Sequence, residues 1–282
     1  MKAPRLAYAR PATVAEALAL LAEHRDDARV LAGGQSLMPM LNLRVAAPRV
    51  LVDINRIAGL SGITLAKDHV RIGALTRHVE LERSVDIARH LPLIAQAMPQ
   101  VAHAAIRTRG TFGGSCALAD PAAELPACAL ALGATFVIAG ARGERRVPAA
   151  EFFRGLYATA LAANEILVAA EFPLPRPGYA SAFGELARRH GDYAMVGVAA
   201  HGSTAGGKFA DLRIVFFGVA ERPLRATKLE QALNGRSSDA IDTALAALDL
   251  ETRGDLQASA ATKKHLARVL AGRVLKQLAG GL

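Results

Sequence analysis

The spacing of apolar residues near the N-terminus predicts alternating short helices and strands. Val14, Ala17 and Leu21 recur at helical spacing, and Thr13 with Glu16 forms a T-x-x-E capping box at the start of that helix. Short apolar runs predict strands at 29–32, 49–54, 134–140 and 145–149, a hairpin within 63–76, and a strand that ends at 172.

Cap residues and helical spacing predict further helices. Thr76 stands where it would cap a helix after the hairpin, and apolar residues from Asp86 to Met98 share one helical face. A helix near 122–132 is expected to begin at Asp120-Pro121, with Asp120 as its cap.

Three prolines mark a boundary in the chain. Pro173, Pro175 and Pro177 form a connector that continues neither a sheet nor a helix. Beyond it, apolar patterns predict a smaller α+β unit made of three strands and a mostly helical end: 181–189, 194–203, 209–220 and 225–280.

Composition narrows the possible functions. The formal net charge is +9, which raises the possibility of a polyanion partner, but the chain has no Trp and only 5% aromatic residues, so it lacks stacking platforms for nucleic acid. Cys116 and Cys128 fit neither a zinc nor an iron-sulfur ligand pattern, so free thiols are expected. The N-terminus has no apolar signal segment, and we expect a cytoplasmic protein without a membrane span.

Glycine-rich segments are the candidate chemistry. The segment 202–209, GSTAGGKF, lacks the final hydroxyl of a phosphate-binding loop and is interpreted as a hairpin turn. The segments AGGQS (32–36) and TFGGS (111–115) each place paired glycines before a serine, so that backbone N–H groups can converge on an anion. Two such loops would suit a pyrophosphate, and plain turns are the alternative.

Two other positions stay open between structure and ligand. Glu124 lies one helical turn after Asp120, so the pair is either a capped helix start with no ligand, or Glu124 binds the hydroxyls of a ribose or ribityl chain. Tyr193 is either an amphipathic strand residue or the cover of an aromatic ligand ring.

Five segments, in order, resemble the FAD-binding medium subunit of molybdenum hydroxylases, the family of carbon monoxide dehydrogenase and xanthine dehydrogenase. They are LAGGQSLMPMLNLR, RIGALT, IRTRGTFGGSCALADPAAELP, EILVAAEFPLP and RRHGDYAMVGVA. The resemblance implies an α+β fold: a two-lobed FAD-binding domain of the vanillyl-alcohol-oxidase (PCMH) type over 1–176, with a lobe boundary near 57–62, and a C-terminal domain over 177–282 with a three-stranded antiparallel sheet.

The resemblance also implies which residues bind FAD, and it assigns no catalytic or metal-ligating residue. Glu185 departs from it, because relatives often have lysine there. The implied cofactor residues are Leu31, Ala32, Gly33, Gly34, Gln35, Ser36, Leu37, Met38, Gly73, Thr76, Val101, Thr111, Gly113, Gly114, Ser115, Asp120, Glu124, Leu167 and Tyr193.

By resemblance, the chain is an oxidoreductase subunit that passes electrons from a partner's clusters through FAD to an external acceptor. The implied partners are an iron-sulfur small subunit and a molybdenum-cofactor large subunit, assembled as a dimer of heterotrimers, with no nucleic acid. A free-standing FAD-dependent oxidoreductase with its own small organic substrate is the alternative, and a basic nucleic-acid-binding module is a second one.

Overall fold

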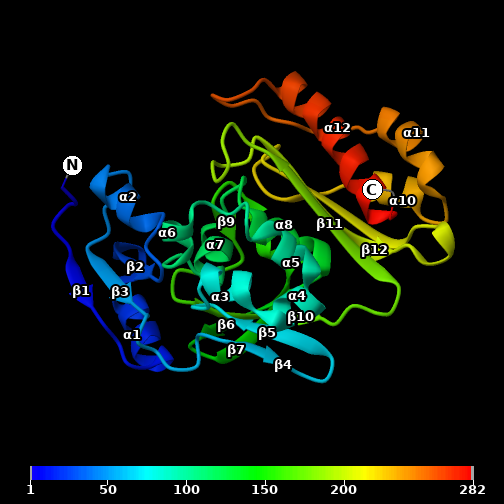
Figure 1. Ribbon diagram of the computed structural model, residues 1–282. Coiled ribbons are helices and arrows are strands. Elements are labelled where there is room, and N and C mark those ends of the chain that lie inside the picture. Colours follow the sequence, from blue (N-terminus) through cyan, green and yellow to red (C-terminus); the bar gives the residue numbers. More distant parts are fainter. Residues whose placement is uncertain (1, 281–282) are drawn as a thin grey trace.

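The computed structural model describes residues 2–280, which form three larger sheets and one two-stranded sheet, with helices packed between and around them (Figure 1). The N-terminal sheet is parallel, with the strand order β1-β3-β2. Its elements are β1 (Ala7–Ala9), α1 (Val14–His24), the 3₁₀ helix η1 (Arg25–Asp27), β2 (Ala28–Leu31), α2 (Leu37–Asn42) and β3 (Val50–Asp53). The Thr13 hydroxyl accepts a hydrogen bond from the Glu16 amide at 3.1 Å, so the predicted start of α1 is confirmed.

The central sheet has five antiparallel strands in the order β4-β5-β10-β6-β7. It contains the predicted hairpin and every strand expected between residues 63 and 173. The strands are β4 (Ile63–Leu65), β5 (His69–Gly73), β6 (Thr135–Gly140), β7 (Gly143–Pro148) and β10 (Ile166–Pro173), and β8 (Phe153–Gly155) pairs separately with β9 (Ala158–Thr159).

Short helices cover one face of the central sheet. They are α3 (His78–Arg83), α4 (Val85–His90), α5 (Pro92–Ala97), α6 (Ala104–Arg107), α7 (Phe112–Leu118), α8 (Glu124–Leu132) and α9 (Ala149–Phe152). The single helix expected from Asp86 to Met98 is wrong, because Leu91 leaves the helical conformation (φ −130°, ψ 57°) before Pro92 starts α5. Proline disfavours the helical conformation of the residue before it, so the chain breaks at Leu91 into two helices.

The C-terminal sheet contains the three predicted strands and adds a fourth of two residues. Its antiparallel order is β11 (Tyr179–Leu186), β12 (Val196–Ser203), β13 (Ala210–Phe217) and β14 (Leu224–Arg225). The predicted turn at 202–209 joins β12 to β13 through η2 (Ala205–Gly207). Four further helical segments follow: α10 (Thr227–Leu233), η3 (Ser238–Ala240), α11 (Ile241–Ala246) and α12 (Ala260–Leu278).

The C-terminal sheet is buried on both faces. One face packs against α12, which lies along β11 and β12 in Figure 1, and the other faces α5 and α8 of the central part. As a result Phe217 of β13 belongs to the same core as Phe112 and Phe172, whereas Phe216 belongs to the core beneath α12. Among the described helices, none combines the length and the apolar composition that a membrane crossing needs.

Candidate cofactor site

The first glycine segment forms an open loop between β2 and α2. Gly34 has φ +74°, a left-handed conformation that favours glycine. Within residues 2–280, no backbone carbonyl accepts a hydrogen bond from the four amides of Gly33 to Ser36. Consecutive N–H groups without protein acceptors are the arrangement that binds an anion, so this loop fits the predicted phosphate role.

The second glycine segment is a capped helix and not the second open loop expected from the sequence. Thr111 caps α7, and its hydroxyl accepts a hydrogen bond from the Gly114 amide at 3.1 Å. The amides of Phe112 and Gly113 donate to the carbonyls of Thr76 and Ala74 at 2.9 and 2.8 Å. These amides therefore hold α7 to the turn after β5. A Cβ at Gly113 would lie 2.5 Å from the Ala74 Cβ, so this glycine permits close packing.

The two glycine segments lie against each other. A Cβ on Gly33 would approach the Arg109 carbonyl oxygen to 2.3 Å, and one on Gly114 would lie 3.9 Å from the Ala32 Cβ. Only glycine at position 33 permits this approach, because real side chains do not occupy such a distance. The free amides of the first loop therefore lie beside the start of α7. This junction between the first loop and α7 is the seam.

A rim of tyrosine, serine and acidic side chains surrounds this seam. The Tyr157 hydroxyl donates to Asp120 Oδ2 at 3.2 Å, and the Ser36 side chain lies near enough to Tyr193 to interact with that phenol. Tyr193 is 61% exposed in the turn between β11 and β12, so the first of its two alternatives, an amphipathic strand residue, is wrong. Partial burial, followed by the charges of Asp120 and Glu124, raises the pKa of Tyr193. The exposed rings thus remain neutral phenols near the first loop.

Asp120 does not cap the following helix. α8 begins at Glu124 with Ala123 as its N-cap, and Asp120 Oδ1 instead accepts from the Ala122 amide at 2.9 Å. The expected cap is wrong because three residues, 121–123, intervene before the chain becomes helical. Asp120 thereby orders the turn that leads to Glu124 and keeps its other oxygen for Tyr157.

Glu124 is a buried carboxyl at the start of α8, only 8% exposed. Burial raises its pKa to about 8, and the nearby Glu185 adds to this shift. Burial likewise raises the pKa of Glu185 to about 7, and within the described chain its buried Oε2 has no hydrogen-bond partner. The two acids lie close enough to interact, so their surroundings favour the protonated, neutral form of both carboxyls.

Other residues implied by the resemblance have their side chains inside the protein. The Thr76 hydroxyl bonds the amide and the carbonyl of Gly62, both at 3.0 Å, and Arg77 is the N-cap of α3, so the predicted Thr76 cap is wrong. A Cβ on Gly73 would lie 2.5 Å from the Leu60 carbonyl oxygen. Val101 and Leu167 belong to the main core. The remaining implied residues lie at the end of β2 and along the first loop, α2 and α7.

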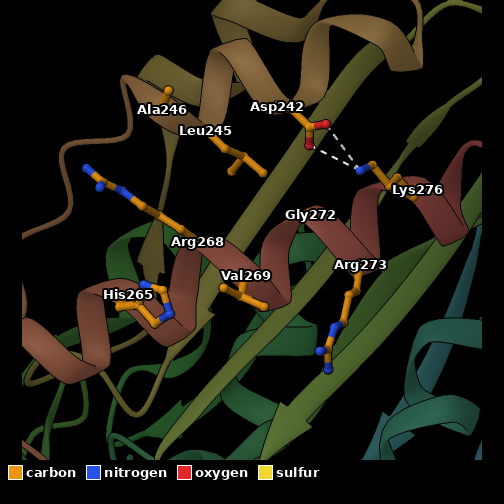
Figure 2. A pocket seen from close by; sticks show the side chains of 9 residues that line it. All are labelled: Asp242, Leu245, Ala246, His265, Arg268, Val269, Gly272, Arg273 and Lys276. Atoms are coloured by element: carbon orange, nitrogen blue, oxygen red, sulfur yellow. Dashed lines mark hydrogen bonds and ion pairs between the residues drawn. The ribbon is translucent and has the colours of Figure 1, made fainter.

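Two concave surfaces lie away from this seam. A groove between α11 and α12 has the small residue Gly272 on its floor and basic side chains along α12 (Figure 2). A polar cavity near β11, β13 and α10 includes Arg213, whose Nη1 lies 3.5 Å from the Ala131 carbonyl oxygen at the end of α8. Neither surface is lined by a residue predicted to bind the cofactor.

Three residues beside the seam were missed from the sequence. Tyr157 has φ +52° and donates a hydrogen bond to Asp120, while Asn55 bonds the Ala32 carbonyl and Arg77 bonds the Arg109 carbonyl, just before the second glycine segment. No local motif marks them, since they are contributed by separate turns. The positive φ of a non-glycine residue is visible only in the fold.

Comparison with known proteins identifies the family. Residues 4–175 match the model of the FAD binding domain in molybdopterin dehydrogenase. The chain belongs to this FAD-binding family. Residues 181–278 match a second model, the CO dehydrogenase flavoprotein C-terminal domain, so the resemblance found in the sequence is confirmed.

Curated members of the molybdopterin dehydrogenase family resemble the chain over most of its length. The carbon monoxide dehydrogenase medium chain of Hydrogenophaga pseudoflava is 38% identical over 278 residues, which cover 96% of each chain. The caffeine dehydrogenase subunit beta of Pseudomonas sp. is 42% identical over 84% of this chain and 80% of the relative. The chain is thus similar to oxidoreductase subunits.

Solved structures agree with the family fold. A carbon monoxide dehydrogenase from Hydrogenophaga pseudoflava that lacks the Mo-pyranopterin moiety matches with a TM-score of 0.94 and 39% identity, covering 100% of this chain and 99% of the other. Quinoline 2-oxidoreductase from Pseudomonas putida 86 matches with a TM-score of 0.93 and 38% identity over the same shares. The predicted α+β fold is confirmed, and the family's cofactor is FAD.

Proposed function

We propose that this chain is the FAD-binding subunit of a molybdenum hydroxylase, and that it holds the pyrophosphate of FAD on the first loop. The observation that carries the proposal is the row of amides from Gly33 to Ser36, which donate to no backbone carbonyl within residues 2–280. Gly33 packs against the backbone of Arg109, which brings these amides beside α7. The family match supplies the identity of the anion.

The remaining implied residues take roles that follow from their positions. Ser36, Thr111, Gly114 and Ser115 border the seam, and Glu124 offers a protonated carboxyl that can donate a hydrogen bond to a sugar hydroxyl. Tyr193, which lies near Ser36, covers an aromatic ring from the exposed side. Gly73, Thr76, Val101 and Leu167 act from inside the protein by shaping the wall behind the seam.

FAD, when bound, supplies the redox chemistry of the subunit by accepting electrons and passing them on. The protein's part is to bind and orient it, to exclude water and to keep nearby carboxyls neutral. Burial keeps the carboxyls of Glu124 and Glu185 neutral by raising their pKa values. This favours FAD binding, because two ionised carboxylates would repel each other and the pyrophosphate.

The proposal places this subunit between two partners. Cys116 and Cys128 are both buried free thiols, so the clusters that feed FAD would belong to an iron-sulfur small subunit, and the substrate to a molybdenum-cofactor large subunit. We place the assembly in the cytoplasm as a dimer of heterotrimers that reduces an external acceptor. Within the chain, we place the domain boundary at 176/177 and the lobe boundary at 57–62, between β3 and β4.

Flavin analysis of the purified full chain tests the proposal. We expect the folded chain to bind added FAD with one site per chain, and heat denaturation of the complex to release FAD and not FMN, as chromatography distinguishes. A folded chain, verified by circular dichroism, that fails to change the fluorescence of added FAD would sink the assignment. Turnover of a small organic donor by the isolated chain would favour the free-standing oxidoreductase instead.

A further inference from the structure

The Arg109 carbonyl, two residues before the second glycine segment, is the point where the first loop contacts the chain that leads into that segment. Gly33 of the first loop packs against this oxygen, and the adjoining residues 110 and 111 lead into α7. Van der Waals contact alone would not fix the separation of two segments that come from different parts of the chain. A hydrogen-bonded connection beside the contact therefore bears directly on the shape of the seam.

Arg77 provides half of that connection. Its Nη1 donates to the Arg109 carbonyl, and its backbone pairs with Thr111 in an isolated antiparallel bridge. Its Nη2 donates to Asn55 Oδ1 at 2.7 Å. Burial lowers the pKa of Arg77, and the nearby charge of Arg109 adds to this, so the guanidinium occupies this place against an electrostatic cost.

Asn55 provides the other half. Its Nδ2 donates to the Ala32 carbonyl at 2.8 Å and to Asp53 Oδ1 at 2.6 Å. Asp53 is itself fixed, because the Tyr8 hydroxyl donates to its Oδ2 and the backbone amide of Asn55 donates to its Oδ1. The side chain of Asn55 therefore has a single arrangement. In it, Nδ2 donates to the first loop and Oδ1 accepts the hydrogen bond from Arg77.

We propose that Asn55 and Arg77 form a two-residue clamp that holds the first loop against the start of α7 and thereby sets the affinity for FAD. The clamp runs from Ala32 through Asn55 and Arg77 to Arg109, and it is a positioning device that rests on the proposed function. It leaves the amides from Gly33 to Ser36 without backbone acceptors, since it uses the carbonyls of Ala32 and Arg109.

The connections of the two segments outside the clamp separate this role from a general contribution to folding. The second segment is anchored by the Thr111 cap and by the bonds of Phe112 and Gly113 to residues 76 and 74. The first loop is anchored by β2, which pairs with β3, and by the Met38 amide, which donates to the Gly34 carbonyl at 3.0 Å. Without the clamp both segments keep their elements, and only their spacing is released.

Binding of FAD to clamp variants of the full chain tests the proposal. We expect Arg77→Met and Asn55→Ala each to weaken FAD binding about tenfold to hundredfold, the range for losing hydrogen bonds that involve a charged donor. Because both residues act through one connection, the double variant should bind no more weakly than the worse single variant. Arg77→Lys keeps the charge but cannot bridge two acceptors in a fork, so it should recover only part of the affinity.

Arg71→Met is the matched control. Arg71 lies on β5 and pairs with Glu171 at 3.3 Å, away from the seam, so its loss should leave the affinity for FAD unchanged. The thermal midpoint of each FAD-free variant separates a positioning role from a structural one. A purely structural role would lower the midpoint, whereas loss of the clamp should leave it unchanged. Clamp variants that bind FAD like the unaltered chain, or losses that add up in the double variant, would overturn the clamp. An unaltered folded chain that binds no FAD would overturn the proposed function and the clamp together.

Discussion

At the scale of single residues, Glu124 is a carboxyl whose surroundings differ strongly from those of a surface carboxylate. It is 8% exposed, and its raised pKa of about 8 follows first from burial and then from the charge of Glu185. A group held in its neutral form by the folded chain makes stability depend on pH. This residue also stands beside the rim formed by Tyr193 and Asp120, so its proton state bears on the site.

The expected pH dependence has a definite sign. Between the ordinary value of 4.5 and about 8, the unfolded chain has released the Glu124 proton while the folded chain retains it. Stability therefore falls as pH rises through this window and levels off above it. Glu124→Gln removes this pH dependence. Relative to its value at pH 5, the free energy of unfolding of the unaltered chain should therefore fall below that of the variant by up to a few kcal/mol at pH 8, at about 1.4 kcal/mol per pKa unit.

Urea unfolding of the flavin-free full chain from pH 5 to pH 8.5, a range chosen to span this window, measures that gain. Glu151→Gln removes an exposed carboxylate from α9 and controls for the loss of a charge. Curves for Glu124→Gln and the unaltered chain that stay parallel across the range would contradict the buried, neutral carboxyl.

At the scale of elements, apolar runs predicted ten of the fourteen strands within residues 2–280. The four that were missed, β1, β8, β9 and β14, have only two or three residues each, too few to show a pattern. The caps were less predictable. The Thr76 hydroxyl is taken by Gly62, which lies across a turn, and Asp120 orders a turn of its own. The first loop was predictable from its glycine pair, whereas Asn55 and Arg77 were not, since their roles arise from contacts between distant turns.

Two threonine caps of the same geometry allow a matched comparison of elements. Thr13 caps α1 and Thr111 caps α7, and each hydroxyl accepts an amide hydrogen bond at 3.1 Å. Replacing either by valine should lower the free energy of unfolding by about 1 kcal/mol, the usual contribution of a cap. Thr111→Val should also weaken FAD binding because α7 borders the seam, and Thr13→Val should not. Equal FAD affinity in the two variants would contradict the placement of α7 in the site.

At the scale of the whole molecule, the proline connector separates two patterns in the sequence, but residues from both sides of it pack into one hydrophobic core. The main core contains Phe112 and Phe172 from before the connector and Val215 and Phe217 from after it. The second core, beneath α12, draws only on residues after the connector. Hydrophobicity indicated that all these residues are buried, but it did not indicate which core each one joins, because that depends on how β13 is sandwiched.

Adjacent phenylalanines on β13 report on the two cores separately. Phe217 packs so closely over Gly197 that a Cβ there would lie 1.9 Å from its ring, and it stacks on Phe183 at 5.7 Å. Phe217→Ala should destabilise the chain by about 3–5 kcal/mol, the usual cost of such a truncation. Because this core reaches the helices behind the seam, FAD should be released at a lower temperature, together with the loss of far-ultraviolet circular dichroism.

Phe216→Ala makes the matched cavity on the other face of the same strand. Its core is confined to residues after the connector, so we expect a similar loss of stability there but a smaller fall in the temperature of FAD release. Flavin fluorescence and circular dichroism followed in the same heating scan measure the difference. FAD release that shifts equally in the two variants would mean that the cores unfold as one unit. No shift in Phe217→Ala would mean that the shared core does not support the FAD site.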